Sequence, residues 1–287
     1  MTECLACGLP NPKDHLLCVG CDSVLVPEES QIPKEPVLMT QDTPLPPGRE
    51  RRCGSCGSLL AAGFSFCMEC GGSVEGGRAR LVTLTEEGTE ESLWVLPDSE
   101  VVIGKDVGPV AFLDDPYISS RHCRIFFVED RLFVEDLNSR NGVYRWLRGE
   151  HPLRVGDRFR VGRQLLQLET MEAQAAPAED GTLLWGSPNP GYLYRLVQLL
   201  EGGIPGEAFP LREGENLVGR ASGDVVFPAD RYVSARHASL SVGPEGVRLR
   251  DLGSSNGTFV RLEKITPLEG GDLLLMGDHL LRVDLDG

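Results

Sequence analysis

Eight of the nine cysteines fall into two blocks with the same internal spacing. Each block has two Cys-x2-Cys pairs separated by ten residues, and the second block repeats the first 49 positions later. Two such pairs can place four thiolates around one point, which is the tetrahedral environment that zinc prefers. The predicted ligands of two structural Zn²⁺ ions are Cys4, Cys7, Cys18, Cys21, and Cys53, Cys56, Cys67, Cys70.

Other cysteine chemistries fit these blocks less well. Disulfides need an oxidising compartment, which nothing in the sequence indicates. A thioredoxin-like redox pair needs a βαβ setting, and the sequence around the four pairs lacks one. Segments of about 20 residues have no adequate core, so a bound metal has to supply folding free energy. A site closed by four thiolates leaves no open position for a substrate, which argues against zinc catalysis.

A second set of polar residues also occurs twice, displaced by a constant 115 positions. Such a regular repeat indicates two copies of one domain. The basic residue, the serine near a histidine, and the Asn-Gly turn are types that can hold a phosphorylated peptide. The matching segments are Gly104-Lys105 and Gly219-Arg220, Ser119-Ser120-Arg121-His122 and Ser234-Ala235-Arg236-His237, Asp136-Leu137 and Asp251-Leu252, and Asn141-Gly142 and Asn256-Gly257.

Composition limits the possible functions. The chain of 287 residues is long enough for two domains and small additional modules. Its formal net charge of −15 argues against broad nucleic-acid binding, which needs a basic surface. No apolar run is long enough for a membrane span. The first residues also lack the basic and apolar regions of a secretory signal, so we expect a cytoplasmic protein.

The elements that position these residues are predicted to be short strands. Val247–Arg250 alternates apolar and polar residues after a Gly-Pro-Glu-Gly turn, and Leu132–Val134 is the matching run in the first copy. The segment 192–200 also fits a helical stripe, but we assign it and its counterpart 81–85 to strands. The sequence therefore predicts an all-β fold with two sandwich domains. The expected boundaries are 1–26 and 51–75 for the two zinc modules, 27–50 and 171–191 for linkers, and 79–170 and 192–287 for the two copies.

The ordered set of motifs in each copy resembles forkhead-associated (FHA) domains. The resemblance implies β-sandwiches whose loops bind phosphothreonine peptides, with a non-enzymatic role. It implies that Arg220 and Ser234 bind the phosphate and that Asn256 holds the peptide backbone, while Ser255 and Arg236 line the same surface. The corresponding residues of the first copy are Lys105, Ser119, Arg121, Arg140 and Asn141. His122, His237, Gly142 and Gly257 are expected to be structural.

The cysteine blocks resemble the double zinc-ribbon modules of bacterial regulatory proteins, which implies a small docking surface. Together the two resemblances describe a bacterial signalling adaptor whose partners are threonine-phosphorylated proteins, such as Ser/Thr kinases or their substrates. Tandem binding domains would add avidity on doubly phosphorylated targets. Thr40 and Thr43, in the first linker, are candidates for phosphorylation that would let the chain occupy its own binding site.

The first copy departs from the family pattern at three positions. Lys105 replaces arginine and loses the planar donor fork, Arg140 stands where the second copy has Ser255, and Val143 replaces Thr258. We therefore predict that the second copy binds phosphothreonine more tightly than the first.

Two other functions remain open from the sequence. The ribbons could contact nucleic acid through Lys13, Arg49, Arg51 and Arg52, with the FHA domains localising the protein. Alternatively, the sandwiches could be scaffolds that bind partners without phosphate. An enzyme is disfavoured because the G-x-S-x-G match at Gly253–Gly257 lies between strand-like runs, whereas a nucleophile elbow needs a strand, a turn and a helix.

Overall fold

The computed structural model describes residues 2–3, 9–11, 50–60, 66–72, 78–86, 88–97, 100–106, 110–171, 177–262 and 265–285. The predicted ligands Cys4, Cys7, Cys18 and Cys21 lie outside the described residues, as do Thr40 and Thr43. These predictions therefore stay predictions.

The described residues form β-strands joined by turns, with one 3-10 turn, η1, at Glu201–Gly203. This confirms the predicted all-β fold class. None of the described residues belongs to a helix that is long and apolar enough to cross a membrane. The strands are β1 Thr2–Glu3, β2 Pro10–Asn11, β3 Glu50–Cys53, β4 Ala79–Leu84, β5 Glu90–Leu96, β6 Val101–Gly104, β7 Val110–Ala111, β8 Cys123–Val128, β9 Arg131–Asp136, β10 Tyr144–Trp146, β11 Glu150–Leu153, β12 Arg158–Val161, β13 Gln164–Thr170, β14 Tyr194–Leu199, β15 Pro205–Leu211, β16 Gly214–Gly219, β17 Val225–Val226, β18 Ala238–Gly243, β19 Gly246–Asp251, β20 Thr258–Arg261, β21 Thr266–Leu268, β22 Leu273–Met276 and β23 His279–Leu285.

The strands follow the predicted alternation of apolar and polar residues. In β19, Val247 and Leu249 are buried while Arg248 and Arg250 are exposed, because successive side chains of a strand point to opposite faces. The ambiguous segment near residue 194 is the strand β14, and its counterpart is the strand β4. The prediction of strands at both places is confirmed.

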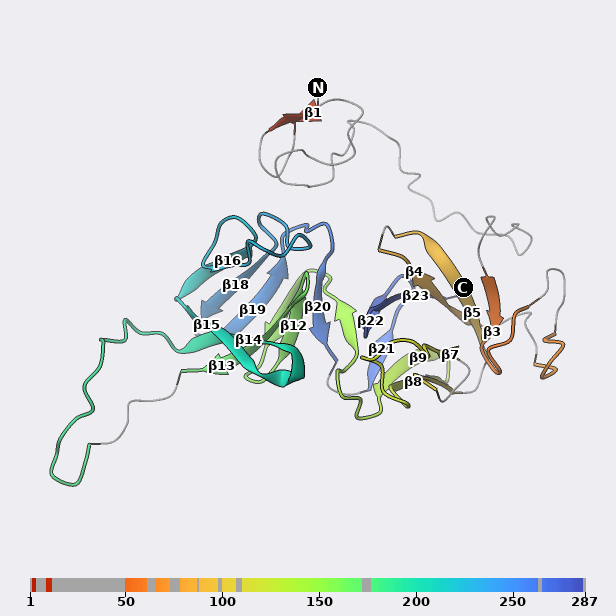
Figure 1. Ribbon diagram of the computed structural model, residues 1–287, viewed down its shortest axis with the longest axis horizontal. Helices are drawn as coiled ribbons and strands as arrows, with labels where there is room; N and C mark the ends of the chain where they lie inside the picture. The colour runs from red at the N-terminus through yellow and green to blue at the C-terminus, as the bar shows by residue number, and fades with distance from the viewer. Residues whose placement is uncertain are drawn as a thin grey trace. The chain divides into compact units, whose positions relative to one another are not determined.

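The chain forms two compact units that do not coincide with the two sequence repeats. We call residues 147–260 the C unit, and residues 50–146 together with 261–285 the N unit. The first repeat therefore supplies β11, β12 and β13 to the C unit, and the second repeat supplies β21, β22 and β23 to the N unit. In Figure 1 the green strands β12 and β13 accordingly lie with the teal and blue strands of the second repeat.

Each unit is a sandwich of two sheets, and the strand orders match except that the N unit has the additional strand β3. The C unit has the orders β15-β14-β13-β12-β20 and β11-β19-β18-β16-β17, and the N unit has β3-β5-β4-β23-β22-β10 and β21-β9-β8-β6-β7. His151 of β11 pairs with Leu249, and Thr266 of β21 pairs with Val134. These two pairs occupy equivalent positions, so the last three strands of the repeats are exchanged without a change of register.

The exchanged strands carry much of each core. Phe159 and Leu168 of the first repeat are fully buried in the C unit beside Leu240. Leu274 and Leu281 of the second repeat are fully buried in the N unit. The boundaries predicted at 79–170 and 192–287 therefore describe sequence repeats, whereas each folded sandwich takes its last strands from the other repeat.

The second cysteine block belongs to the N unit. Its strand β3 pairs in parallel with β5 and extends that sheet by one strand. Gly54 N donates to Val95 O at 2.8 Å, and a Cβ at Gly54 would clash with that oxygen, so this contact requires glycine. Leu60 packs on Val82 and Leu93, which form a small apolar cluster on the sheet. The ribbon is thus docked on the neighbouring sandwich.

Candidate functional site

Three loops of the C unit meet at Ser234. They are the loop after β16, the loop before β18 and the loop between β19 and β20. Arg220 N donates to Ser234 O at 2.9 Å, and Ser255 N donates to Ser234 Oγ at 3.1 Å. Because the hydroxyl oxygen of Ser234 accepts this bond, its hydrogen can be donated to a further acceptor, such as a phosphate oxygen. We call this group the C site.

The C site also contains the predicted asparagine. Asn256 Nδ2 donates to Tyr232 O at 2.9 Å, which ties the β19–β20 loop to the segment just before Ser234. An amide held through its NH2 group can present its oxygen to a peptide N–H. Arg236 is exposed two residues after Ser234, and Ser255 is exposed beside Asn256. All five predicted C-site residues therefore lie on these three loops.

His237 links two of the loops through both ring nitrogens. Ser234 N donates to His237 Nδ1 at 3.0 Å, and His237 Nε2 lies 3.1 Å from Gly257 O. Nδ1 is an acceptor here, so the proton is assigned to Nε2, which donates to the carbonyl. Burial lowers the pKa of His237 below its ordinary value of 6.5, which favours this neutral tautomer. The side chain is engaged within the loops and fully buried.

Asp251 holds the β19–β20 loop in shape, although it was not among the predicted site residues. Asp251 Oδ1 accepts from Ser254 N at 2.9 Å, and Oδ2 accepts from Ser254 Oγ at 2.7 Å and Thr258 Oγ1 at 2.6 Å. Gly257 N in turn donates to Ser254 Oγ at 2.9 Å. Gly257 has φ of +75°, and its equivalent Gly142 has φ of +86°, a conformation that favours glycine. The repeated Asp-Leu pair was the sequence signal for this role.

The first-copy residues form an equivalent N site in the N unit. Lys105 N donates to Ser119 O at 3.0 Å, Arg140 N donates to Ser119 Oγ at 3.1 Å, and Asn141 Nδ2 donates to Tyr117 O at 2.8 Å. The loops thus keep their backbone arrangement despite the substitutions at Lys105 and Arg140.

The histidine bridge is also repeated in the N site. Ser119 N donates to His122 Nδ1 at 3.1 Å, and His122 Nε2 lies 3.0 Å from Gly142 O. Arg121 is exposed on the same loop. One loop contact differs, because Val143 cannot make the hydrogen bond to the aspartate that Thr258 makes in the C site.

Each site also depends on a turn from the other repeat, which the sequence reasoning missed. In the C unit, Asp230 Oδ2 accepts from Arg163 N at 2.9 Å and from Gln164 Nε2 at 2.7 Å. In the N unit, Asp115 Oδ2 accepts from Asp278 N at 2.9 Å. Both aspartates stand four residues before the site serine, which was the available signal. The exchanged strands therefore hold the loops of both candidate sites.

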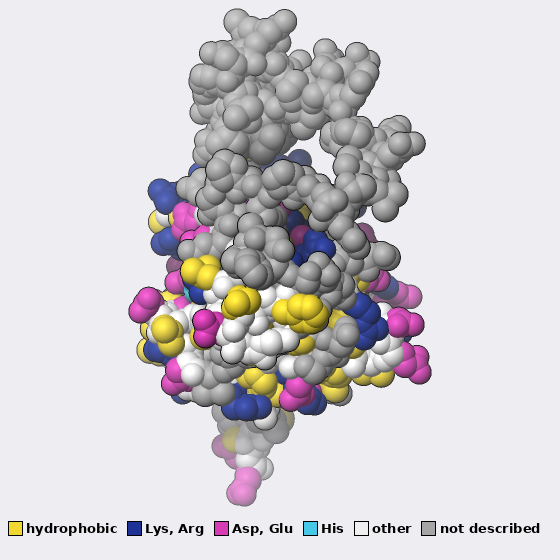
Figure 2. All heavy atoms as spheres, turned by 90° about the vertical axis from the view of Figure 1, so that its right-hand side faces the viewer, with side chains coloured by type: hydrophobic (Ala, Val, Ile, Leu, Met, Phe, Trp, Pro, Cys, Tyr) yellow, Lys and Arg dark blue, Asp and Glu magenta, His cyan; other side chains and the backbone are white. Residues whose placement is uncertain are grey.

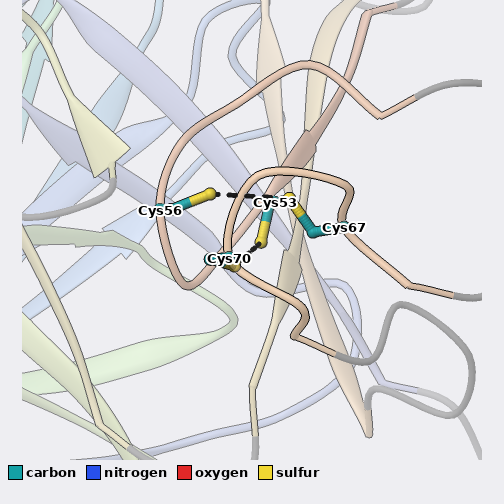
Figure 3. A group of neighbouring side chains, drawn as sticks. All are labelled: Cys53, Cys56, Cys67 and Cys70. Atoms are coloured by element: carbon teal, nitrogen blue, oxygen red, sulfur yellow. Dashed lines mark hydrogen bonds between the residues drawn. The ribbon is translucent and has the colours of Figure 1, made fainter.

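The second cysteine block has the arrangement expected of a tetrathiolate metal site. Its four sulfur atoms all lie within 4.8 Å of one another, and Figure 3 shows them converging from two turns. Cys53 and Cys70 Sγ are 3.7 Å apart, and Cys56 and Cys67 Sγ are 3.6 Å apart. A tetrahedral zinc site with Zn–S bonds of about 2.3 Å has sulfur atoms about 3.8 Å apart. The four residues could therefore hold one metal ion.

The hydrogen bonds around the cluster favour a thiolate at Cys56. Hydrogen bonding to Ser58 lowers the pKa of Cys56 to about 6, and Ser55 N donates to Cys53 Sγ at 3.4 Å. Donors near the sulfur stabilise the charged form that binds metal. Cys123, in contrast, is fully buried, and burial raises the pKa of its thiol. Cys123 therefore packs in the core as an apolar residue.

Comparison with known proteins assigns both repeats to one kind of domain. Residues 101–162 and 216–277 each match the family model of the FHA domain. Each matching segment continues across the point where the chain passes from one unit to the other. The chain therefore carries two FHA domains in tandem, with their last strands exchanged.

Similar proteins come from mycobacteria. FHA domain-containing protein FhaB of Mycobacterium tuberculosis is 37% identical over 86 residues, which are 30% of this chain and 55% of FhaB. FhaB of Mycolicibacterium smegmatis is 35% identical over 75 residues, which are 26% of this chain and 48% of that protein. The chain thus spans about half the length of these relatives. A solved structure described as an analysis of phosphothreonine-dependent FHA domain interactions is 32% identical, with a TM-score of 0.21, and covers 32% of this chain and 95% of that one.

Proposed function

We propose that this protein is a non-enzymatic adaptor that binds threonine-phosphorylated proteins through its two FHA domains. The observation that carries the proposal is the arrangement at Ser234. Its hydroxyl oxygen accepts from Ser255 N, which leaves the hydroxyl hydrogen to donate, and its carbonyl is bonded to the backbone of Arg220. A phosphate with about −1.5 to −2 charges has three acceptor oxygens for such donors.

The roles within the C site follow from the chemistry of each group. The guanidinium of Arg220 offers a planar pair of donors for two phosphate oxygens. Ser234 donates its hydroxyl hydrogen to a phosphate oxygen, and Asn256 binds the peptide backbone next to the phosphothreonine. Arg236 and Ser255 line the remaining surface. In this proposal the natural ligands are Ser/Thr kinases or their substrates, and the protein acts in the bacterial cytoplasm.

A hydrolase function has no support from the loop that matches G-x-S-x-G. Gly253–Gly257 connects the strands β19 and β20, and the hydroxyl of Ser254 donates to Asp251. A nucleophile elbow would instead place its serine between a strand and a helix. This loop geometry supports a binding role.

We further propose that Cys53, Cys56, Cys67 and Cys70 hold a structural Zn²⁺. The sulfur separations fit the ion, and the closed set of four ligands would keep it structural. Zinc would supply folding free energy to the ribbon and a fixed surface for partners. The first block has the same spacing and is proposed to bind a second ion in the same way.

Nucleic-acid binding by the second ribbon is the weaker alternative. The guanidinium of Arg52 lies 5.5 Å from the centre of the Trp94 ring and donates to Gly57 O at 3.4 Å, so it takes part in docking the ribbon. Among the described residues that are visible in Figure 2, basic and acidic side chains are interspersed, without one broad basic area. Steeply salt-dependent binding of the protein to nucleic acid would favour this alternative.

The proposal is tested by calorimetric titration of the full chain with a phosphothreonine peptide selected on it, and with the same peptide unphosphorylated. Arg220→Ala should weaken phosphopeptide binding by about 1.5–3 kcal/mol, or roughly 10- to 150-fold, because one charge-assisted contact is lost. Arg220→Lys, which installs the first-copy residue, should cause a smaller loss. Lys105→Ala should matter less than Arg220→Ala, because the C site is expected to bind more tightly. Arg248→Ala serves as the control, since Arg248 is exposed in the middle of β19.

The outcomes separate the three functions. Phosphate-dependent binding that falls with Arg220 supports the adaptor. Binding of partners that persists after phosphatase treatment would point to a phosphate-independent scaffold. Equal affinities at the two sites would contradict the predicted order.

A further inference from the structure

The linker between the two repeats presents an apolar segment to solvent. Residues 182–190 form neither helix nor strand, and in Figure 1 this part of the chain extends away from the strands of the C unit. Leu183, Leu184 and Trp185 are 71, 83 and 95% exposed. Contiguous apolar side chains at a surface are typical of interaction sites, whereas isolated ones are not. This stretch is therefore a candidate binding element.

Two carboxylates stand just before these apolar side chains. Glu179 and Asp180 are exposed in a turn that is closed by hydrogen bonds from Gly181 N to Ala178 O at 2.8 Å and from Ala178 N to Thr182 O at 2.9 Å. Thr182 N also donates to Asp180 Oδ1 at 2.9 Å. The turn thus fixes the acidic residues next to the apolar ones. We call residues 179–185 the linker segment.

The N unit carries a row of apolar side chains on the outer face of the sheet β21-β9-β8-β6-β7, in which β21, β9 and β8 lie side by side (Figure 1). Phe126 pairs with Phe133, and Phe133 pairs with Pro267. The phenylalanines alternate along their strands with the buried Ile125 and Val134, so they point away from the core and are only half-buried. Their rings stack with centroids 5.9 Å apart, and Pro267 is exposed. We call these three residues, Phe126, Phe133 and Pro267, the outer row.

Aliphatic and basic side chains border the outer row. Val128 and Ile265 are 51 and 52% exposed, and Val128 pairs with the exposed Arg131. The guanidinium carbon of Arg131 lies 5.6 Å from the centre of the Phe133 ring. This face therefore suits a ligand that brings apolar side chains together with a carboxylate. The linker segment has both features.

The C unit has different residues at the corresponding place. Ser241 and Arg248 stand at the positions of Phe126 and Phe133, and they pair in the same register. Both are exposed. Because the same framework folds with serine and arginine at these positions, the sandwich does not require two phenylalanines there. The aromatic pair of the N unit is therefore available for binding.

We propose that the linker segment of one copy of this chain docks on the outer row of a second copy, and that the two copies exchange these contacts reciprocally. The 95% exposure of Trp185 shows that the described part of its own chain does not cover it. In the dimer Trp185 packs on Phe133, while Glu179 and Asp180 lie near Arg131. Reciprocal exchange closes the assembly with twofold symmetry, so neither copy keeps an unpaired binding surface.

Two such contacts together approach the size that a dimer requires. A tryptophan buries about 150–250 Å², and each contact adds two leucines and the surface of the outer row that they cover. Counted over both contacts and both copies, this brings the total toward the roughly 1,200–2,000 Å² that stable interfaces bury. Once one contact has formed, the second is intramolecular, which raises the overall affinity.

Sedimentation velocity of the full chain, with zinc and a reducing agent present, measures the assembly. We expect a concentration-dependent dimer for the wild-type protein. Trp185→Ser and Phe133→Arg should each weaken association at least about tenfold, since a buried aromatic anchor contributes much of an interface's affinity. Phe133→Arg installs the residue that the C unit has at this position, so the sandwich should still fold. Leu193→Ser removes another exposed apolar side chain, outside the linker segment, and should leave association unchanged.

Mixing the two variants separates exchange between copies from a loss of folding. The Phe133→Arg chain keeps its linker segment and the Trp185→Ser chain keeps its outer row, so the mixture should form a heterodimer that neither variant forms alone. A labelled peptide of residues 178–187 should bind the Trp185→Ser chain and lose at least about tenfold in affinity when Phe133→Arg is added. Arg131→Glu should also weaken peptide binding, whereas Arg248→Glu, the same charge change in the C unit, should not.

Three results would overturn the proposal. A dimer that persists in either aromatic variant would point to another interface, such as strands exchanged between copies. A wild-type chain that stays monomeric while the peptide binds the outer row would place the linker segment on its own chain. A monomeric wild type whose Trp185→Ser variant binds no peptide would leave the outer row without this ligand. Since none of these measurements involves phosphate, the proposed adaptor function is tested separately.

Discussion

At the scale of single residues, each candidate site depends on a histidine that joins two loops. In the C site, His237 accepts from Ser234 N and donates to Gly257 O. A proton added to Nδ1 would remove the acceptor for Ser234 N and place two donors against each other. Desolvation opposes that proton, because the ring is fully buried, even though Asp251 lies 4.0 Å from Nε2. The orientation of Ser234 therefore depends on the charge state of His237.

The lowered pKa of His237 predicts that acid destabilises the C unit. In the unfolded chain the imidazole takes up a proton as the pH falls through about 6.5, whereas in the folded protein it does so only at lower pH. The contribution of His237 to stability is thus complete above pH 6.5 and is lost as the pH falls from there toward the folded pKa. The free energy of unfolding should fall by at most about 1.4 kcal/mol per pH unit from this group.

Urea unfolding at pH 7.5, 6.5 and 5.5 measures this effect. His237→Gln should be less stable at pH 7.5, because the paired hydrogen bonds are disturbed, and should have a shallower pH dependence below pH 6.5. Carboxylates titrate alike in both proteins and cancel in the difference. Identical slopes for the two proteins would show that His237 does not carry the pH effect.

At the scale of elements, the two units protect the corresponding sheet edges in different ways. In the N unit, β3 of the ribbon covers the edge strand β5, and Leu60 packs on Leu93 and Val95. The positions equivalent to Leu93 and Val95 are Ala208 and Pro210 on β15, the strand that ends that sheet among the described residues. Proline cannot donate to a further strand and is typical of edges. The apolar pair on β5 thus marks where a ribbon docks.

Because the ribbon is part of the N unit, metal removal should destabilise that sandwich. A strong zinc chelator should lower its thermal midpoint by about 5 °C or more, since a ligand that binds only the folded state stabilises it. The fluorescence of Trp94, which is 6% exposed in the core of the N unit and lies beside Arg52 of β3, reports this transition once Trp146 and Trp185 are replaced by Phe.

Two cysteine variants provide the control. Cys67→Ala should mimic the effect of the chelator and make the protein insensitive to it. Cys123→Ala also removes a buried thiol, but from the sandwich core, and should remain sensitive to the chelator. A midpoint that does not respond to chelation in the wild-type protein would contradict a metal at this cluster.

At the scale of the whole molecule, the sequence predicts the strands and the loop residues but not which repeat completes which sandwich. Phe159 and Leu274 are equivalent in the repeats, and each is fully buried in the other repeat's core. Apolar patterning alone cannot distinguish a repeat that completes its own sandwich from one that completes the other sandwich, since either segment keeps the same face buried. The site residues were predictable because they lie on local motifs, whereas Asp230 and Arg163 meet only through the exchange.

Polar residues that differ between the repeats favour the exchanged closure. Glu150 of β11 stands opposite Arg250, while closure within the first repeat would place it opposite Glu135. Opposite charges across strands stabilise by about 0.2–1 kcal/mol, and like charges destabilise. Arg282 likewise forms an ion pair with Glu90 of the other repeat. If the second repeat completed its own sandwich, Arg282 would instead face Pro205, the residue equivalent to Glu90. Gln198 Nε2 also donates to Gln164 Oε1 at 2.7 Å. If the first repeat completed its own sandwich, Gln164 would instead face Thr83, the residue equivalent to Gln198.

The exchange predicts which of two cysteine pairs will form a disulfide. Glu150 and Arg250 are direct partners in neighbouring antiparallel strands, so their Cα atoms lie about 4.5–5.5 Å apart, within the range that a disulfide spans. Glu150→Cys with Arg250→Cys should therefore link on mild oxidation, whereas Glu150→Cys with Glu135→Cys should not. Peptide mapping of the unreduced protein by mass spectrometry identifies the bond despite the native cysteines. A bond between 150 and 135 would mean that the first repeat closes on itself. A 150–250 bond found only in covalent dimers would mean that the same strands are exchanged between two copies of the chain, because either route buries the same apolar face.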